Sequence, residues 1–234
     1  MNDNEKKLQQ LSKQWVRENK KKLISEFCHN EKFPSYKKPL TIFMAGSPGA
    51  GKTEFSISLL QEFDEKFVRI DADEIREKMR HMGYAGTNAP VFQTATTKAV
   101  NILFDSANKK GQNVLLDGTF TYSGWKDNVE RSVNKGRYIE IYYLHQDPVV
   151  AWNFVKERES KQGRAVPKEV FIDAYLRSAK NVNRAKDLFG SRITVNFVKN
   201  NYQKSVKEIV VDVVHIDDSL TEMYNRAKLG QILQ

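Results

Sequence analysis

The chain has 234 residues, of which 40% are hydrophobic and 11% aromatic, so it is long and apolar enough to fold around one sizeable core. The sequence lacks an apolar run near the roughly 20 residues that cross a bilayer, and its polar start, MNDNEKKLQQ, lacks the apolar core of a signal peptide. The single cysteine, Cys28, excludes an internal disulfide and a cysteine-rich metal site, which favours a cytoplasmic protein. The net charge of +9 favours anionic partners, although a lysine run such as 20–22 is typical of a solvated helix face.

The first segment has a helical pattern of apolar residues. Leu8, Leu11 and Trp15, and further on Leu23 and Phe27, predict one amphipathic helix over about 5–27 that packs on the outside of the domain. A loop with two prolines follows, and the core begins after it. We therefore expect an N-terminal helical extension over 1–36, followed by a main domain over 37–234.

In the main domain, strand-like runs alternate with helical windows. The runs rich in β-branched and aromatic residues are 40–45, 67–70, 113–116, 138–144 and 193–198. The helical windows between them are 52–63, 73–82, 92–109, 124–135, 148–162 and 167–189. Such alternation predicts an α/β fold with a mostly parallel central sheet flanked by helices, and ligands beyond the carboxyl ends of the strands. The tail over about 204–230 fits helix or strand equally.

A phosphate-binding loop follows the first of these strands. The run matches G-x-x-x-x-G-K-[ST] in full, with a strand before it and a helical window after it. Its residues are Gly46, Ser47, Pro48, Gly49, Ala50, Gly51, Lys52 and Thr53. Glycines let the backbone amides close on phosphates, the lysine supplies a charge to the β- and γ-phosphates, and the threonine hydroxyl is a ligand for Mg²⁺. The pattern predicts a P-loop NTPase/kinase fold that uses ATP and Mg²⁺, but by itself it does not separate kinases from switches and motors.

Acidic residues follow the next two strands. Asp71 and Asp73 stand at the end of the second strand, where one carboxylate can accept the proton of an acceptor hydroxyl and the other can hold Mg²⁺. An N-cap is the alternative for Asp71, and both roles can hold at once. Asp117 follows the third strand and is a candidate for Mg²⁺ or for substrate hydroxyls, with Thr119 beside it. We assign Asp73 as the base and place Asp71 and Asp117 at the metal.

Two arginines flank a glycine break in the lid, about 156–168. Arg158 lies before Gly163 and Arg164 after it, and Pro167 begins the next helix. Cations on a closing lid can stabilise the charge of a phosphoryl group in transfer, and closure excludes water. A solvated basic turn is the alternative, but beside a P-loop and an acid pair we interpret both arginines as catalytic.

Together these motifs resemble the zeta-toxin family of P-loop kinases, the toxins of epsilon–zeta toxin–antitoxin systems. The resemblance covers about 40–200 and rests on GSPGAGKT, IDADEIR, LLDGT and the GRAVPKE element after Arg158. It implies that Lys52 binds phosphate, Asp73 is the general base, and Arg158 and Arg164 act on the transferred group. It also implies a nucleotide-sugar acceptor such as UDP-N-acetylglucosamine, phosphorylated on a sugar hydroxyl, and a protein antitoxin.

The chain departs from the family after the third strand. Family members often have Glu-Gly-Thr followed two residues later by an arginine, whereas this chain has Asp117 and, in place of the arginine, Thr121. The chain therefore lacks, at position 121, the positive charge that would bind the acceptor diphosphate, unless another residue supplies one. We take Asp73, Asp117, Thr119, Thr121 and Tyr84 as candidate acceptor-binding residues.

Two other functions fit parts of the pattern. A polynucleotide or nucleoside kinase shares the P-loop, the acids and the lid arginines, but the sequence lacks the basic stripe with interleaved aromatics that is typical of single-strand binding. A nucleotide-dependent switch or ATPase module has a P-loop too, yet it needs no base for an acceptor hydroxyl. The N-terminal helix has two possible roles, to pack on the sheet or to cover the ATP site in cis.

Overall fold

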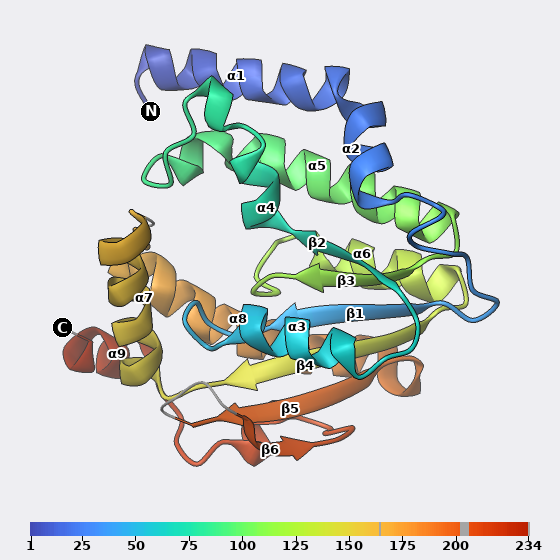
Figure 1. Ribbon diagram of the computed structural model, residues 1–234. Coiled ribbons are helices and arrows are strands. Elements are labelled where there is room, and N and C mark those ends of the chain that lie inside the picture. Colours follow the sequence, from blue (N-terminus) through green and yellow to red (C-terminus); the bar gives the residue numbers. More distant parts are fainter. Residues whose placement is uncertain (164, 202–205, 234) are drawn as a thin grey trace.

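The structure is a computed structural model that describes residues 1–163, 165–201 and 206–233. Within these residues six strands form one sheet in the order β2-β3-β1-β4-β5-β6 (Figure 1). The strands are β1 (Leu40–Ala45), β2 (Phe67–Asp71), β3 (Asn113–Asp117), β4 (Tyr138–His145), β5 (Thr194–Asn200) and β6 (Val206–Val210). The pairs from β2 to β5 are parallel, and β6 pairs with β5 antiparallel. The predicted α/β fold with a mostly parallel sheet is confirmed.

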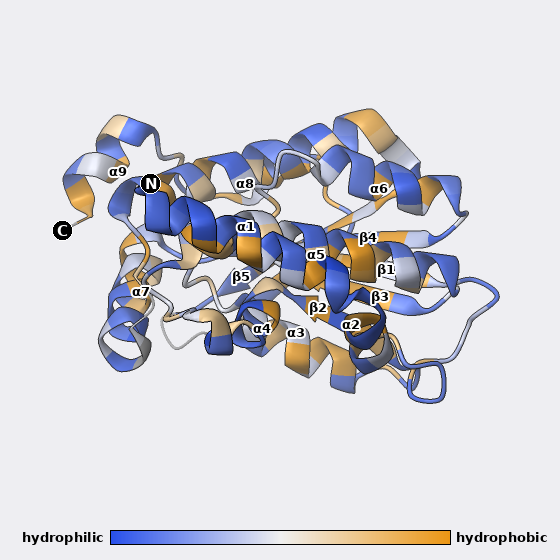
Figure 2. Cartoon of the chain, turned by 90° about the horizontal axis from the view of Figure 1, so that it is seen from above, coloured by the Kyte–Doolittle hydropathy of each residue, from blue (hydrophilic) through white to orange (hydrophobic). Residues whose placement is uncertain are grey.

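Helices cover both faces of this sheet. The α-helices are α1 (Asp3–Glu18), α2 (Lys20–Phe27), α3 (Lys52–Gln61), α4 (Ala72–Glu77), α5 (Ala89–Lys109), α6 (Trp125–Asn134), α7 (Pro148–Gln162), α8 (Lys168–Phe189) and α9 (Arg226–Ile232). The 3-10 turns are η1 (Arg80–Met82), η2 (Gly190–Arg192) and η3 (Ile216–Ser219). Helices α6 and α8 lie on one face and α3 lies on the other (Figure 2). The buried side chains of α5 belong to the same apolar core as those of α6 and α8. None of these helices is long and apolar enough to span a membrane.

The side chains of β1 show why its sequence is almost continuously apolar. Ile42 and Met44 belong to the apolar cluster beneath α3, whereas Phe43 and Ala45 belong to the larger core on the opposite face. Successive strand residues point to opposite faces, so a strand covered on both sides needs apolar residues at every position. The parallel strands of this sheet end at one edge, and the polar residues that follow them meet there.

The N-terminal segment departs from the prediction in two ways. One helix over 5–27 was expected, but the chain forms α1 and α2, which meet at Asn19. The Asn19 side chain donates to the carbonyl oxygen of Trp15 at 3.0 Å, so an asparagine–backbone hydrogen bond closes the first helix. Both helices pack mainly on α5 rather than on the sheet, and α1 lies alongside α5 in both views (Figures 1 and 2).

Two further segments differ from the sequence-based expectation. The window 73–82 divides into α4 and η1, and Gly83 with φ of 94° closes the second turn. The ambiguous tail contains both kinds of element, because β6 joins the edge of the sheet and α9 packs on α8. Its sequence fitted either conformation, and the open edge of β5 provides the hydrogen bonds that favour a strand in the first half.

Candidate active site

The P-loop joins β1 to α3, and its backbone requires glycine. Gly46 has φ of 127°, and a Cβ atom there would lie 2.3 Å from the Leu144 carbonyl oxygen. Gly49 has φ of 76°, and its Cβ would lie 2.1 Å from the Ala151 carbonyl oxygen. Gly51, in the left-handed region with φ of 85°, is the residue before α3. The loop is therefore held against β4 and α7 at distances that no other residue permits.

Two side chains from distant segments brace the loop. The Gly46 amide donates to Ser178 Oγ on α8 at 2.6 Å, and the Asn200 amide nitrogen donates to the Ala50 carbonyl oxygen at 2.6 Å. Both side chains are buried. The amide of Asn200, the last residue of β5, thus lies against the P-loop backbone. The sequence contained no signal for Ser178.

Lys52 is buried at the start of α3. Its Nζ donates to the Ser47 carbonyl oxygen at 2.6 Å, across the loop. Burial lowers the pKa of Lys52 to about 8, although the charge of Asp117 acts in the opposite direction and Arg158 adds to the lowering. The lysine therefore lies within electrostatic reach of both the β3 carboxylate and the α7 arginine.

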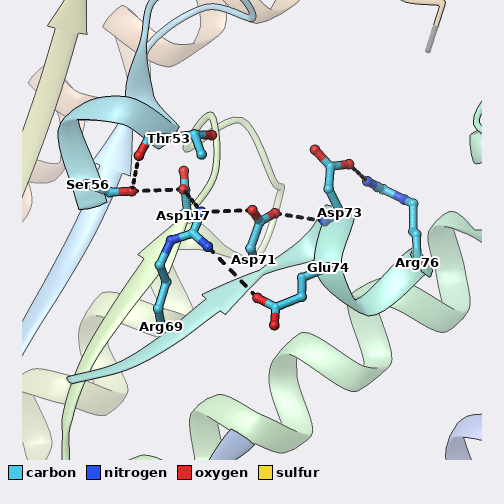
Figure 3. A network of polar contacts seen from close by, with 8 residues as sticks. All are labelled: Thr53, Ser56, Arg69, Asp71, Asp73, Glu74, Arg76 and Asp117. Carbon is cyan, nitrogen blue, oxygen red and sulfur yellow. Dashed lines mark hydrogen bonds and ion pairs between the residues drawn. The ribbon is translucent and has the colours of Figure 1, made fainter. Parts of the chain in front are cut away.

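Asp71 and Asp117 are cross-strand partners. They stand opposite one another in the parallel register of β2 and β3, so the two carboxylates meet at one edge of the sheet. Arg69 bridges them, because its Nη2 lies 2.9 Å from Asp71 Oδ2 and 2.5 Å from Asp117 Oδ2 (Figure 3). Ser56 Oγ donates to the same oxygen of Asp117 at 3.1 Å. Burial opposes the charge of Arg69, but Asp117 and Asp71 outweigh it and raise the pKa of the guanidinium.

Asp71 and Asp73 have different geometries. Asp71 is the N-cap of α4, and its Oδ1 accepts from the Asp73 backbone amide at 2.8 Å. Asp73 lies in the first turn of α4, where its Oδ1 accepts from Arg76 Nη1 at 2.7 Å (Figure 3). Arg76 also donates to the Gln93 side chain on α5, and burial lowers the pKa of its guanidinium. The cap thus aims the two carboxylates in different directions.

The turn after β3 is held in an unusual conformation. Phe120 has a positive φ of 60°, which is costly for an aromatic residue, and its ring packs on Phe43 and Trp125 at centroid distances of 5.7 and 5.4 Å. Its carbonyl oxygen accepts from Asn181 at 2.9 Å. Within the turn, the hydroxyls of Thr119 and Thr121 lie 2.7 Å apart. This turn therefore presents hydroxyl groups from a conformation that packing maintains.

These groups line one cleft of about 810 Å³. Its lining includes the P-loop, the carboxylates of Asp71, Asp73 and Asp117, the hydroxyls of the β3 turn, and Arg158 from α7. Tyr84 also lines it, mostly buried and with its ring against Phe92. Residues of α1 and α2 are absent from the described lining. Arg164, the second lid arginine, lies outside the described residues.

The donor set at the sheet edge suits Mg²⁺. Thr53 stands beside Ser56, Asp71 and Asp117, all of them hydroxyl or carboxylate ligands of the kind that hard cations prefer (Figure 3). Among the described residues, three His, Cys, Asp or Glu side chains do not gather closely enough to hold a metal ion by themselves. The residues present fit a cation that takes further ligands from ATP phosphates and water.

Sequence reasoning missed Arg69 and Arg76. Arg69 is a charged residue inside the apolar strand run FVRI, two positions before Asp71, and a charge at such a place is a signal of a buried partner. Arg76 follows Asp73 by three residues, which is one helical turn. Both signals could have been found in the sequence. The partners that these arginines contact on other strands and helices could not.

A family model described as Zeta toxin matches residues 24–212, which is most of the chain. The chain belongs to the zeta-toxin family. A curated relative, Toxin PezT of Streptococcus pneumoniae, is 26% identical over 148 residues, covering 58% of this chain and 58% of PezT. The chain thus matches this curated relative over little more than half of its length. The expected family membership is confirmed.

Solved structures agree on the fold. A chain from a structure of the PezAT chromosomal toxin–antitoxin system of Streptococcus pneumoniae has a TM-score of 0.69 at 16% identity, covering 99% of this chain and 94% of that one. A chain of the AvrRxo1-ORF1:-ORF2 complex with ATP has a TM-score of 0.58 at 12% identity, covering 88% and 65%. A chain of the Pnkp1/Rnl/Hen1 RNA repair complex has a TM-score of 0.51 at 15% identity, covering 83% and 55%. At these identities the likeness shows a shared fold.

Proposed function

We propose that this zeta-toxin family member is an ATP-dependent phosphotransferase that moves the γ-phosphate to a sugar hydroxyl of a nucleotide sugar such as UDP-N-acetylglucosamine. One observation carries the proposal: a P-loop and a carboxylate suited to act as a base, Asp73, line the same cleft. A nucleotide-dependent switch or motor needs the P-loop but needs no base for an acceptor hydroxyl. The cleft has room for a nucleotide and an acceptor together, since about 810 Å³ is near the upper end of ordinary ligand sites.

In the proposed reaction Asp73 accepts the proton of the acceptor hydroxyl. The hydroxyl oxygen forms a bond to the γ-phosphorus, the bond from that phosphorus to the β,γ-bridging oxygen breaks, and ADP leaves. Lys52 and Arg158 neutralise charge on the transferred group, and Arg164 is assigned the same role from the sequence. Thr53 and Asp117, with Asp71 beside them, would hold Mg²⁺, which when bound neutralises phosphate oxygens.

The biological part of the proposal is that the protein is the toxin of a toxin–antitoxin pair in the cytoplasm. Membership of the zeta-toxin family supports it, as does the fold shared with a chain of the PezAT system. We expect expression in a bacterial host to arrest growth, and we expect Lys52→Ala to relieve the arrest. Arrest that persists with Lys52→Ala at equal protein level would contradict a toxic activity that depends on ATP.

The direct test is phosphate transfer to a panel of acceptors. Purified protein with Mg·ATP is offered nucleotide sugars, nucleosides and 5′-hydroxyl oligonucleotides, and products are identified by their added mass. A nucleotide-sugar phosphate is the expected product, and Asp73→Asn should lower kcat by roughly 10²- to 10⁴-fold, as loss of a general base does. Asp64→Asn, an exposed aspartate before β2, is the matched control. Transfer only to oligonucleotides or nucleosides, or ATP hydrolysis without any product, would refute the proposal.

A further inference from the structure

The cations around the cleft are unevenly placed. Among the described lining residues they are Lys52, Arg76 and Arg158. Lys52 belongs to the P-loop and Arg158 to α7, so both stand where the ATP phosphates are proposed to bind. Arg76 comes from α4 and stands beside Asp73, where the acceptor hydroxyl is proposed to lie. The acceptor part of the described cleft therefore draws its positive charge from Arg76.

Arg76 is held in place from two sides. Its Nη1 donates to Asp73 Oδ1 at 2.7 Å, and its Nη2 donates to Gln93 Oε1 at 2.7 Å. The side chain is 13% exposed, so little of its surface faces bulk water. A guanidinium has five N–H donors, and these two contacts use two of them. A fixed, partly desolvated guanidinium with donors to spare is suited to binding phosphate oxygens.

A second part of the cleft wall, after β3, is uncharged. The turn after β3 and the start of α6 contribute hydroxyl, amide and aromatic groups to the lining: Thr119, Thr121, Tyr122, Trp125 and Asn128. The Thr119 and Thr121 hydroxyls already lie within hydrogen-bond distance of each other. This wall can contact a sugar or a base, but it offers no charge to an anionic group.

We propose that Arg76 binds the anionic group of the acceptor, the diphosphate in the case of a nucleotide sugar, while it keeps its contact with the base Asp73. The proposal rests on the proposed function and specifies how the acceptor is recognised. One guanidinium then joins the two parts of the acceptor, because it contacts the carboxylate that takes the hydroxyl proton and the phosphates that anchor the molecule. The chemical class of ligand is a sugar or nucleoside bearing a phosphate or diphosphate.

The competing explanation is purely structural. Arg76 ties α4 to α5 through Gln93, and its loss could simply misplace Asp73. The two explanations differ in their dependence on the acceptor. A misplaced base lowers kcat for every acceptor, whereas a lost anion contact raises KM for charged acceptors alone.

The test compares a charged acceptor with an uncharged one. Arg76→Gln is assayed with UDP-N-acetylglucosamine and with N-acetylglucosamine, which lacks the diphosphate. Loss of a charge-assisted contact should raise KM for the nucleotide sugar by roughly ten- to a hundredfold and leave KM for the free sugar within about twofold. Arg80→Gln is the matched control, since Arg80 is exposed, pairs with Glu77 and lies outside the described lining of the cleft. Equal KM changes for both acceptors would overturn the inference.

A second measurement separates this inference from the proposed function. UDP alone is titrated into the protein saturated with a non-hydrolysable ATP analogue, and no transfer is needed. We expect Arg76→Gln to weaken UDP binding by about tenfold or more, and the added change Thr121→Arg, at an uncharged position of the same cleft, to restore most of it. Unchanged UDP affinity in Arg76→Gln would refute the role of Arg76. Arg76-dependent UDP binding without transfer to any nucleotide sugar would retain that role and refute the proposed function.

Discussion

Arg69 shows how one charged residue organises the site. It lies between Asp71 and Asp117, and the Asp117 side chain is 5% exposed. Two carboxylates this close would repel one another without a cation between them. Because Ser56 and Arg69 both donate to Oδ2 of Asp117, its other oxygen is left for a metal or a hydroxyl. Arg69 is therefore a positioning residue.

Removing Arg69 should affect both stability and Mg²⁺ dependence. Arg69→Met leaves Asp117 without its main counter-charge, which should cost about 3 kcal/mol in the free energy of unfolding. Urea denaturation measures this, and the double change Arg69→Met with Asp117→Asn should recover most of the loss. A role in positioning also predicts a changed Mg²⁺ concentration for half-maximal activity, with partial rescue in Arg69→Lys. A stability equal to that of the unchanged protein would contradict this account.

Lys52 makes ATP binding dependent on pH. Its pKa in the folded protein is about 8, below the usual value near 10.5, because the amine is buried. Below pH 8 the Lys52 amine is protonated and can bind phosphate directly. Above pH 8 the amine is neutral, so it must take up a proton when ATP binds. The affinity for Mg·ATP should therefore be nearly constant from pH 6.5 to 7.5 and fall above pH 8, by at most about tenfold per pH unit. Calorimetry in buffers of different ionisation enthalpy detects the proton uptake, and its absence at pH 9 would refute the prediction.

At the scale of elements, the N-terminal helices are part of the main core. Val16, Leu23 and Phe27 are buried in the same apolar cluster as residues of α5 and the sheet. These helices therefore share the apolar core of the residues that follow them. Such helices bury part of the apolar face of α5, and their loss would expose it to water.

We expect core substitutions in these helices to lower global stability. Leu23 is 2% exposed on α2, and Leu23→Ala should lower the free energy of unfolding by about 2 to 5 kcal/mol. Leu11→Ala on α1 is the control, because that side chain is 45% exposed and should change stability by less than about 0.5 kcal/mol. Thermal or urea unfolding reads out both. If the two variants are equally stable, the helices are an appendage.

At the scale of the whole molecule, stability should fall in mild acid. His145 at the end of β4 is buried against Phe197, and burial lowers its pKa to about 4 from 6.5. The unfolded chain then binds a proton that the folded chain does not, so stability is lost as the pH falls from 6.5 towards 4. The loss should approach about 3 kcal/mol at the acid end. Urea midpoints at pH 7 and pH 5 for the unchanged protein and His145→Asn measure it, and an equal pH dependence in both would contradict the assignment.

The sequence by itself determined the fold class and most of the cleft. Strand–helix alternation and a full P-loop pattern are local signals, so five strands, the P-loop and the acids at the ends of β2 and β3 were all predictable. Local signals failed where a nearby hydrogen bond competed with the pattern, as at Asn19, and where the sequence of the tail fitted two conformations.

Only the tertiary structure decided which side chains meet. Asp71 and Asp117 stand 46 residues apart in the chain and become partners through the register of two parallel strands. Arg76 can donate to Gln93 only because α4 packs on α5. The P-loop likewise makes its hydrogen bonds with Ser178 of α8 and Asn200 of β5 only in the folded chain. Side-chain type and spacing are written in the chain, but contacts between distant segments follow from packing, which no local pattern encodes.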